Sequence, residues 1–292
     1  MKNIPPKNSL RELPDDQRDF PLGAVVSQMN VLDIPDEDFV VAEPILIKNQ
    51  GESDLCSGYA VCAVSEDQEG EELLPEYQFF KTKEISGDPD EWGADLRSAC
   101  KSAVQYGSIP NRNGLGQFKG ISREQTLDPN TWPSYADEVA EFHKKRTYFD
   151  VLKGGQYDVF DNIRTALWKN RAKKCSIVTG AKWRTEWLDA PGGRIQKEYG
   201  TAGFGHAFKI FGQKKIGAEM YLVAQLSQGS EVGDNGLFYF PREVVNKEIG
   251  RFGVFMFYDI DREKAEKIIK KKEQSGDGFF SRVWSFLISI FQ

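Results

Sequence analysis

A seven-residue segment that ends in a cysteine, Gln50-Gly51-Glu52-Ser53-Asp54-Leu55-Cys56, constrains this chain more than any other. The residues that follow, 57–64, are mostly small or apolar and predict a helix that begins at Cys56. A thiol at a helix N-terminus lies at the positive end of the helix dipole, which favours the thiolate. The side-chain amide of Gln50, six residues earlier, could point back toward the same sulfur. An acyl-transfer enzyme with a cysteine nucleophile needs this arrangement.

A cysteine nucleophile also needs a histidine, and the chain has only two. His206 lies in an apolar, glycine-containing run, 203–208, and is the candidate partner; His143 lies in a charged helical stretch and is expected to be a plain surface residue. Taken singly, Cys56 would be a buried small side chain, His206 a core residue and Gln50 a loop amide. Together the three favour a catalytic reading.

Composition narrows the partners and the compartment. A net charge of -6 and a pI near 5.3 argue against nucleic acid as a main partner, because phosphate binding needs clustered cations. The four cysteines form no CxxC pair, and Cys62, Cys100 and Cys175 suit apolar packing, so we expect no metal and no other cofactor. Residues 1–20 carry no apolar run that would act as a signal peptide. A reducing, cytoplasmic setting is therefore expected.

Hydrophobic periodicity divides the chain into a helical first part and a strand-rich second part. The helices are expected after Cys56 and at 74–83, 95–106, 134–145 and 157–169, with a long connection at 108–132. The strands are expected at 175–182, 206–213, 220–226, 236–240 and 252–258. This organisation is α+β, with the nucleophile on the helical side and the histidine on the strand side.

Several of these segments resemble the papain-like cysteine peptidases. Residues 47–56 are similar to the nucleophile segment of that family, and 205–212 to its histidine strand; 221–223 and 229–238 resemble the stretch that follows. The interval 206 − 56 = 150 residues also agrees with the family. Leu13-Pro14-Asp15, Arg18-Asp19-Phe20 and 93–97 look like its bacterial or phage-type branch, and the resemblance covers roughly residues 12–260.

The resemblance implies a fold and a mechanism. The fold would have a helical left lobe and an antiparallel, β-barrel-like right lobe, with the active-site cleft between them. Cys56 would attack a peptide carbonyl and form an acyl-enzyme, with His206 holding the thiolate and then protonating the leaving amine. Gln50 and the Cys56 backbone N–H would stabilise the oxyanion. Gly93 and Ala94 would pair with an extended polypeptide substrate.

The sequence departs from the family where the imidazole is normally oriented. Leu226 stands at the position of the orienting asparagine, and leucine cannot make a hydrogen bond with His206. A one-residue slip of the strand would present Gln225 instead. Ser53 replaces the cysteine of a nearby disulfide and Ser57 replaces an aromatic residue, which suggests a wetter site in a reducing compartment. We therefore expect a cysteine endopeptidase that works slowly without the asparagine; the alternatives are a catalytically impaired peptide-binding or structural protein, and a related thiol hydrolase such as a cell-wall amidase.

The two ends of the chain differ from the middle. We divide the sequence into an N-terminal arm (1–40), the catalytic domain (41–262), a charged helix with a hinge (263–278) and an amphipathic tail (279–292). The 49 residues before Gln50 carry few helical signals and cannot supply a long inhibitory prodomain, so regulation is expected in the arm or the tail. Nine of the fourteen tail residues are large and apolar, too few to span a bilayer. The tail would lie on a membrane surface, bind a partner protein or fold back onto the domain.

Overall fold

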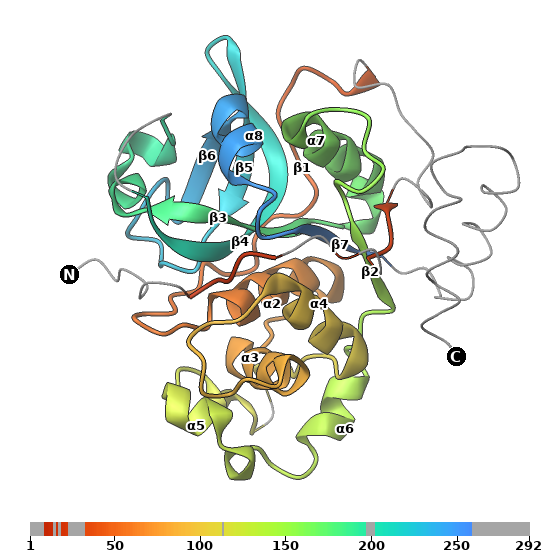
Figure 1. The fold of residues 1–292 in the computed structure, drawn as a ribbon, viewed down its shortest axis with the longest axis vertical. Coiled ribbons are helices and arrows are strands. Elements are labelled where there is room, and N and C mark those ends of the chain that lie inside the picture. Colours follow the sequence, from red (N-terminus) through yellow and green to blue (C-terminus); the bar gives the residue numbers. More distant parts are fainter. Residues whose placement is uncertain are drawn as a thin grey trace, which may run out of the picture.

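A helical lobe and a sheet lobe lie one against the other (Figure 1). The structure is a computed structural model that describes residues 9–13, 16, 19–22, 33–112, 114–196 and 202–258. The helical lobe contains α2 (Cys56–Glu69), α3 (Pro75–Ser86), α4 (Leu96–Gln105), α5 (Arg123–Leu127) and α6 (Ala136–Glu141). Short 3-10 turns at Gly116–Phe118 and Pro129–Thr131 connect the last of these.

Local signals set the ends of the main helices. Asp95 precedes α4, and its side chain accepts the backbone N–H of Ser98, which satisfies one of the free donors of the first turn. Pro75 is the first residue of α3, where its missing N–H costs nothing. Gly70 and Gly87 end α2 and α3 with φ of 76° and 70°, a left-handed conformation that glycine adopts without strain.

The sheet lobe is built on one antiparallel sheet with the strand order β2-β7-β3-β4-β5-β6, and β1 pairs with β4 along the edge opposite β5. Its strands are β1 (Phe39–Val40), β2 (Thr147–Asp150), β3 (Ile177–Arg184), β4 (Ala202–Ile216), β5 (Glu219–Gln225), β6 (Leu237–Pro241) and β7 (Val254–Tyr258). The lobe also holds α7 (Val159–Asn170), α8 (Arg242–Glu248) and 3-10 turns at Arg171–Lys173, Thr185–Asp189 and Pro191–Gly193. In the described strands the sheet is open, with β2 and β6 at its edges.

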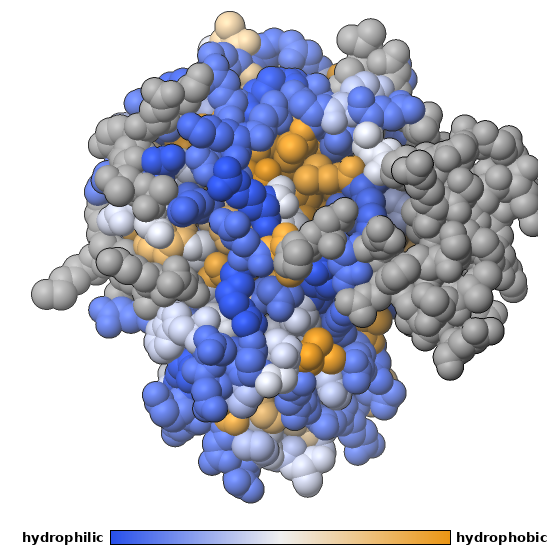
Figure 2. Space-filling model, viewed as in Figure 1, coloured by the Kyte–Doolittle hydropathy of each residue, from blue (hydrophilic) through white to orange (hydrophobic). Residues whose placement is uncertain are grey.

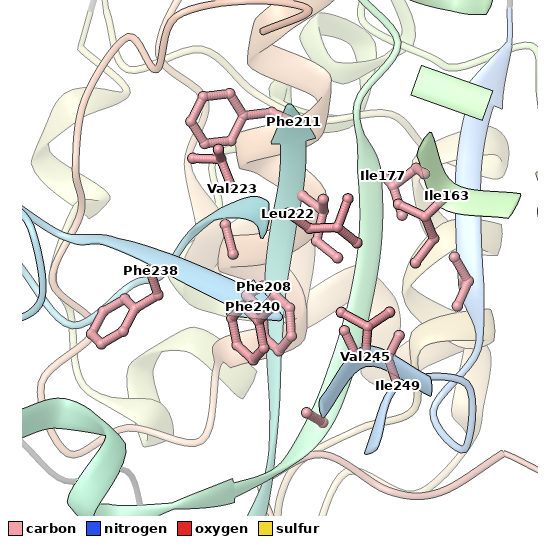
Figure 3. Close-up of a cluster of buried hydrophobic side chains, with 14 of the residues drawn as sticks. Ile163, Ile177, Phe208, Phe211, Leu222, Val223, Phe238, Phe240, Val245 and Ile249 are labelled. Carbon is pink, nitrogen blue, oxygen red and sulfur yellow. The ribbon is translucent and has the colours of Figure 1, made fainter. Parts of the chain in front are cut away.

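The sheet buries both faces, each against different helices. One face carries the larger core, in which Phe208 and Phe240 stack with ring centroids 5.2 Å apart and α7 and α8 close the cluster (Figure 3). The other face packs on α2 through a second cluster that includes Cys56, Ala207 and Phe257. On the outer surface, apolar side chains gather mainly over the sheet lobe, whereas the helical lobe is largely hydrophilic on the same face (Figure 2).

The α+β organisation and the papain-like pairing of a helical with an antiparallel sheet lobe are confirmed. The expected helices and strands are all present within a few residues, although the sheet is open rather than closed into a barrel. Strand β2 and helix α8 were not predicted, and the connection 108–132 contains α5. No helix in the described part of the chain is long and apolar enough to cross a membrane. The charged helix with its hinge and the tail, 263–292, lie outside the described residues.

Candidate active site

Cys56 is the first residue of α2 and is completely buried. The preceding residue, Leu55, offers no side-chain cap, so no side chain competes with the thiol for the N–H groups of the first turn. Burial raises the pKa of the Cys56 thiol to about 11, because the thiolate loses its hydration. Hydrogen bonds with the Ala207 backbone and the Ser9 hydroxyl act in the opposite direction but do not outweigh burial. The resting group at neutral pH is therefore a thiol.

His206 lies on β4, opposite Ala181 of β3, and is also completely buried. Its ring contacts two aromatic rings at centroid distances of 5.6 Å (Trp183) and 6.4 Å (Phe204). Neither ring nitrogen has a hydrogen-bond partner among the described residues. Burial lowers the pKa of His206 to about 3, since no charge or polar group in the described structure compensates the imidazolium. Cys56 and His206 are thus two neutral groups on neighbouring elements, without a hydrogen bond between them.

The backbone explains how these two residues can lie so near in the fold and remain unpaired. Successive residues of a strand point to opposite faces of the sheet. Ala207, the neighbour of His206, belongs to the cluster that packs on Cys56, whereas the rings that contact His206 belong to the larger core on the other face. The imidazole is therefore packed toward the sheet core and not toward the thiol.

The amide of Gln50 is held in a polar loop just before α2. Its nitrogen donates to the Ser53 carbonyl over 2.7 Å, and its oxygen accepts the Ser227 hydroxyl over 2.5 Å. A second N–H on the same nitrogen has no bond within the loop. The backbone N–H of Gln50 also donates to the Ser227 carbonyl over 2.9 Å, so this loop is tied to the chain that follows β5. These bonds fix the side-chain amide of Gln50, and with it the direction of the second N–H of its nitrogen.

The two residues considered for orienting His206 have other surroundings. Gln225 donates to the Leu46 carbonyl over 2.8 Å and lines a small cavity of about 10 Å³ between the lobes, together with Ala207. Its side-chain oxygen has no partner within the described structure. Leu226 is buried in the larger core, in the same cluster as Trp183 and Phe204. The structure therefore brings neither residue into a hydrogen bond with His206.

Gly93 and Ala94 lie at the boundary between the lobes, but Ala94 is already paired. We name Ser9–Leu13 the interlobe segment. The Ala94 N–H donates to the Ser9 carbonyl over 3.2 Å, and the Arg11 N–H donates to the Ala94 carbonyl over 3.2 Å. Gly93 is held from the other side, where its N–H donates to the Asp54 carboxylate over 2.7 Å. The helical lobe therefore presents an edge of backbone to which an extended chain is bonded.

The interlobe segment is bonded to the sheet lobe as well. The Leu10 N–H and the Ser9 hydroxyl both donate to the carbonyl of Gly205, the residue before His206, over 3.0 Å each. The Leu10 side chain is 3% exposed, and a Cβ added to Gly180 would lie 2.2 Å from its Cδ2 atom. The absence of a side chain at Gly180 thus makes room for Leu10. The segment, drawn in red in Figure 1, runs along the boundary between the lobes. Leu10 packs in the same cluster as Cys56, and the Ser9 hydroxyl bonds the thiol.

Sequence reasoning did not identify Ser9 and Leu10 as site residues, nor Asp54. Asp54 is fully buried, bonds Gly93 and accepts the Arg123 guanidinium at 3.1 Å, and its charge further raises the pKa of Cys56. Two leucines, Leu10 and Leu13, in a polar N-terminal arm were the available signal for the segment. In the described chain, no three histidine, cysteine or acidic side chains are grouped so that they could hold a metal ion.

Comparisons with known proteins bear on the fold. No protein-family model matches the chain, and no curated protein matches its sequence. Among solved structures, xylellain, a cysteine protease from Xylella fastidiosa, aligns over 88% of this chain and 98% of its own, with a TM-score of 0.67 and 18% identity. The chain has the papain-like fold. Digestive procathepsin L 3 of Tenebrio molitor aligns over 82% of this papain-like chain and 73% of its own at a TM-score of 0.59 and 14% identity. Bromelain from Ananas comosus, solved with the E64 inhibitor, aligns over 76% of this chain and 98% of its own, with a TM-score of 0.54 and 15% identity.

Proposed function

We propose that this papain-like chain is a cysteine endopeptidase that acts on extended polypeptide. One observation carries the proposal: the chain's own interlobe segment lies between Ala94 and Gly205, bonded to both backbones, with the Ser9 hydroxyl at the Cys56 thiol. The groups that flank Cys56 are therefore able to bind an extended backbone from both sides. The fold shared with named cysteine proteases supports the same reaction.

In the proposed reaction the Cys56 thiolate adds to the substrate carbonyl carbon. The resulting oxyanion accepts the spare N–H of Gln50 and the Cys56 backbone N–H; loss of one such donor typically costs about 10²–10³ in rate. The carbon–nitrogen bond then breaks, and His206, as imidazolium, gives its proton to the leaving amine. Water, deprotonated by His206, next attacks the thioester carbonyl and releases the acid and the thiol.

The resting site has to change before this reaction can begin. A thiol with a pKa of about 11 and an imidazole with a pKa of about 3 do not exchange a proton at neutral pH, because the ion pair is disfavoured in the dry site. We propose that the described structure is a latent form. Departure of the interlobe segment would admit water and substrate. It would also release the backbone of β4 at Gly205, so that this stretch could change the face on which it presents His206.

Removal of residues 1–12 tests both the function and the latency. We expect a peptidyl epoxide to label Cys56 slowly in the full chain at pH 7 and about 100-fold faster in the shortened chain, because the covering backbone is gone. Cys56→Ala should remove the label, and Cys100→Ala, a buried cysteine on α4, should leave it unchanged. Cleavage of casein by the shortened chain would support the endopeptidase, whereas release of cell-wall fragments without casein cleavage would point to an amidase. An unlabelled Cys56 in both chains, with casein intact, would refute the proposal.

We also propose that the tail 279–292 directs the enzyme to a membrane surface or a partner protein. Its nine apolar side chains and the lysines upstream support this role. Deletion of 276–292 should move the protein from the membrane or complex fraction to the free fraction. Unchanged fractionation would leave folding back onto the domain as the role of the tail.

A further inference from the structure

A buried ion pair joins the helix that carries Cys56 to the strand that carries His206. Lys209 Nζ lies 2.9 Å from Asp67 Oδ1, and the two side chains are 1% and 0% exposed. The second carboxylate oxygen of Asp67 accepts the Ser176 hydroxyl, and Lys209 also approaches the Ala63 carbonyl at 3.4 Å. The pair therefore joins α2 to β4 and, through Ser176, to the residue before β3.

The positions of the pair along α2 and β4 match those of the proposed catalytic residues. From Cys56 to Asp67 is 67 − 56 = 11 residues, close to three turns of helix, so the two lie on one face of α2. Lys209 is two residues beyond Ala207 and shares its face of the strand, the face toward α2. The helix thus meets β4 at Cys56 and Ala207 near its start, and at Asp67 and Lys209 in its last turn.

Two contacts fix a helix against a strand where a single contact would allow it to pivot. Gln68, next to Asp67, adds a bond to the Phe257 carbonyl of β7 over 3.3 Å, so the last turn of α2 is tied to three strands or their flanks. At the other end Cys56 packs on Ala207 with one hydrogen bond between the thiol and the Ala207 backbone, a weaker tie than a charge-assisted pair. The ionic end therefore determines how β4 is placed along α2.

Stability alone does not account for this pair. Desolvating two charges is expensive, and apolar residues of similar volume often replace a buried ion pair with no loss of stability. Burial raises the pKa of Asp67 and lowers that of Lys209, which shows how strongly the site opposes isolated charges. The best-attested use of such a pair is to specify one arrangement among several similar packings.

We propose that Asp67 and Lys209 are positioning residues that hold the part of β4 around Lys209 in register on α2, so that only the stretch around Gly205 and His206 rearranges when the interlobe segment leaves, and His206 stays within reach of Cys56. The inference rests on the proposed Cys56–His206 chemistry. The pair does not touch the substrate; it acts through the backbone of β4, three residues from the imidazole.

The test replaces the pair with apolar residues, Asp67→Leu together with Lys209→Met, so that no charge is left unpaired, both in the full chain and in the chain without residues 1–12. We expect kcat for peptide hydrolysis to fall at least tenfold, KM to stay within about twofold and the thermal midpoint to stay near that of the parent. The pH profile of Cys56 labelling should also shift toward that of a simple thiol, because the imidazole is no longer in place. A role in stability alone would leave this profile and kcat unchanged.

A matched control removes an ion pair inside the sheet lobe, Arg184→Met with Glu248→Leu, whose charged atoms lie 3.2 Å apart away from α2. This variant should keep the parent kcat and pH profile. Equal losses in both double variants, or a normal kcat in the first, would overturn the inference. A parent protein that neither labels at Cys56 nor hydrolyses peptide, as the full chain and without residues 1–12, would instead overturn the proposed function, so the two failures are distinguishable.

Discussion

The two faces of β4 differ in whether their polar side chains have hydrogen-bond partners. On the face toward α2, polar groups are partnered: Lys209 bonds Asp67, and the Cys56 thiol meets the Ser9 hydroxyl and the Ala207 backbone. On the opposite face, His206 lies among aromatic rings, and both of its nitrogens lack partners in the described structure. The groups around the proposed nucleophile, Cys56, are therefore in place, whereas the proposed base, His206, is packed in the sheet core.

This difference separates binding from catalysis in one fold. An extended chain can be held between Ala94 and Gly205 without any help from the imidazole. Proton transfer needs His206 to leave an apolar environment in which it is neutral. Under the proposed function, the backbone that would bind the substrate is therefore in place and the proposed base, His206, is not, and the largest barrier to activity would lie in the exchange between these two states.

Replacing the buried leucine of the interlobe segment should have the largest effect on that exchange. Leu10→Ala removes a side chain that is 3% exposed, and such a loss typically costs about 3 kcal/mol. We expect peptidyl-epoxide labelling of Cys56 to rise by about 100-fold, because the segment leaves the site more often.

Glu12→Ala, at an exposed position of the same segment, is the control and should leave the labelling rate unchanged. Equal rates for the parent chain and Leu10→Ala would mean that the segment does not limit access to the thiol, and that the unpaired state of His206 is the whole barrier.

The sequence predicted the elements of this site better than their arrangement. Cys56 could be placed at a helix start because small and apolar residues follow it without a break, and α2 does begin there. His206 could be placed on a strand because its neighbours are apolar and β-prone, and β4 contains it. These are local patterns, which a single sequence carries in full.

What the sequence could not show depends on contacts between distant residues. The direction of the His206 ring is set by Trp183 and Phe204, and the occupation of the lobe boundary by Ser9–Leu13 depends on Gly180 and Gly205, about 170–195 residues away. A glycine that makes room for a leucine so far along the chain leaves no periodic signal. The ionic tie between α2 and β4 is hidden for the same reason, since Asp67 and Lys209 each look like surface charges in sequence.

Acid should lower the free energy of unfolding through His206, on the core face of β4, and not through Cys56, on the face toward α2. The folded-state pKa of His206 is about 3 and its ordinary value is about 6.5, so the unfolded chain binds a proton that the folded chain excludes between these values. Above pH 6.5 His206 does not lower the free energy of unfolding. Below pH 6.5 its titration lowers the free energy of unfolding by about 1.4 kcal/mol for each pH unit, down to about pH 3. Urea unfolding of the parent at about pH 6.5 and about pH 5 should therefore show an acid-linked loss of about 2 kcal/mol.

His206→Phe should lack this component, so that the difference between the two proteins isolates it from the carboxylates and from His143, which both retain. Parallel pH profiles for the parent and His206→Phe would show that the ring is hydrated or partnered in solution, and the contrast between the two faces of β4 would disappear.

A hydrogen-bond partner for the His206 imidazole should have the smallest effect on the difference between the two faces of β4. Leu226→Asn places an amide in the cluster that contains Trp183 and Phe204, whose rings contact His206. Both nitrogens of the imidazole lack partners among the described residues. A new hydrogen bond contributes about 1 kcal/mol and would hold the ring in the sheet core, away from Cys56, so we expect peptide hydrolysis by the chain without residues 1–12 to fall about fivefold. Leu222→Asn, equally buried in that core, controls for the cost of the amide itself and should only destabilise. If both variants lose hydrolysis in proportion to their stability, the amide introduced at position 226 does not reach the ring, and the orientation of His206 has to come from β4 and its ionic tie to α2.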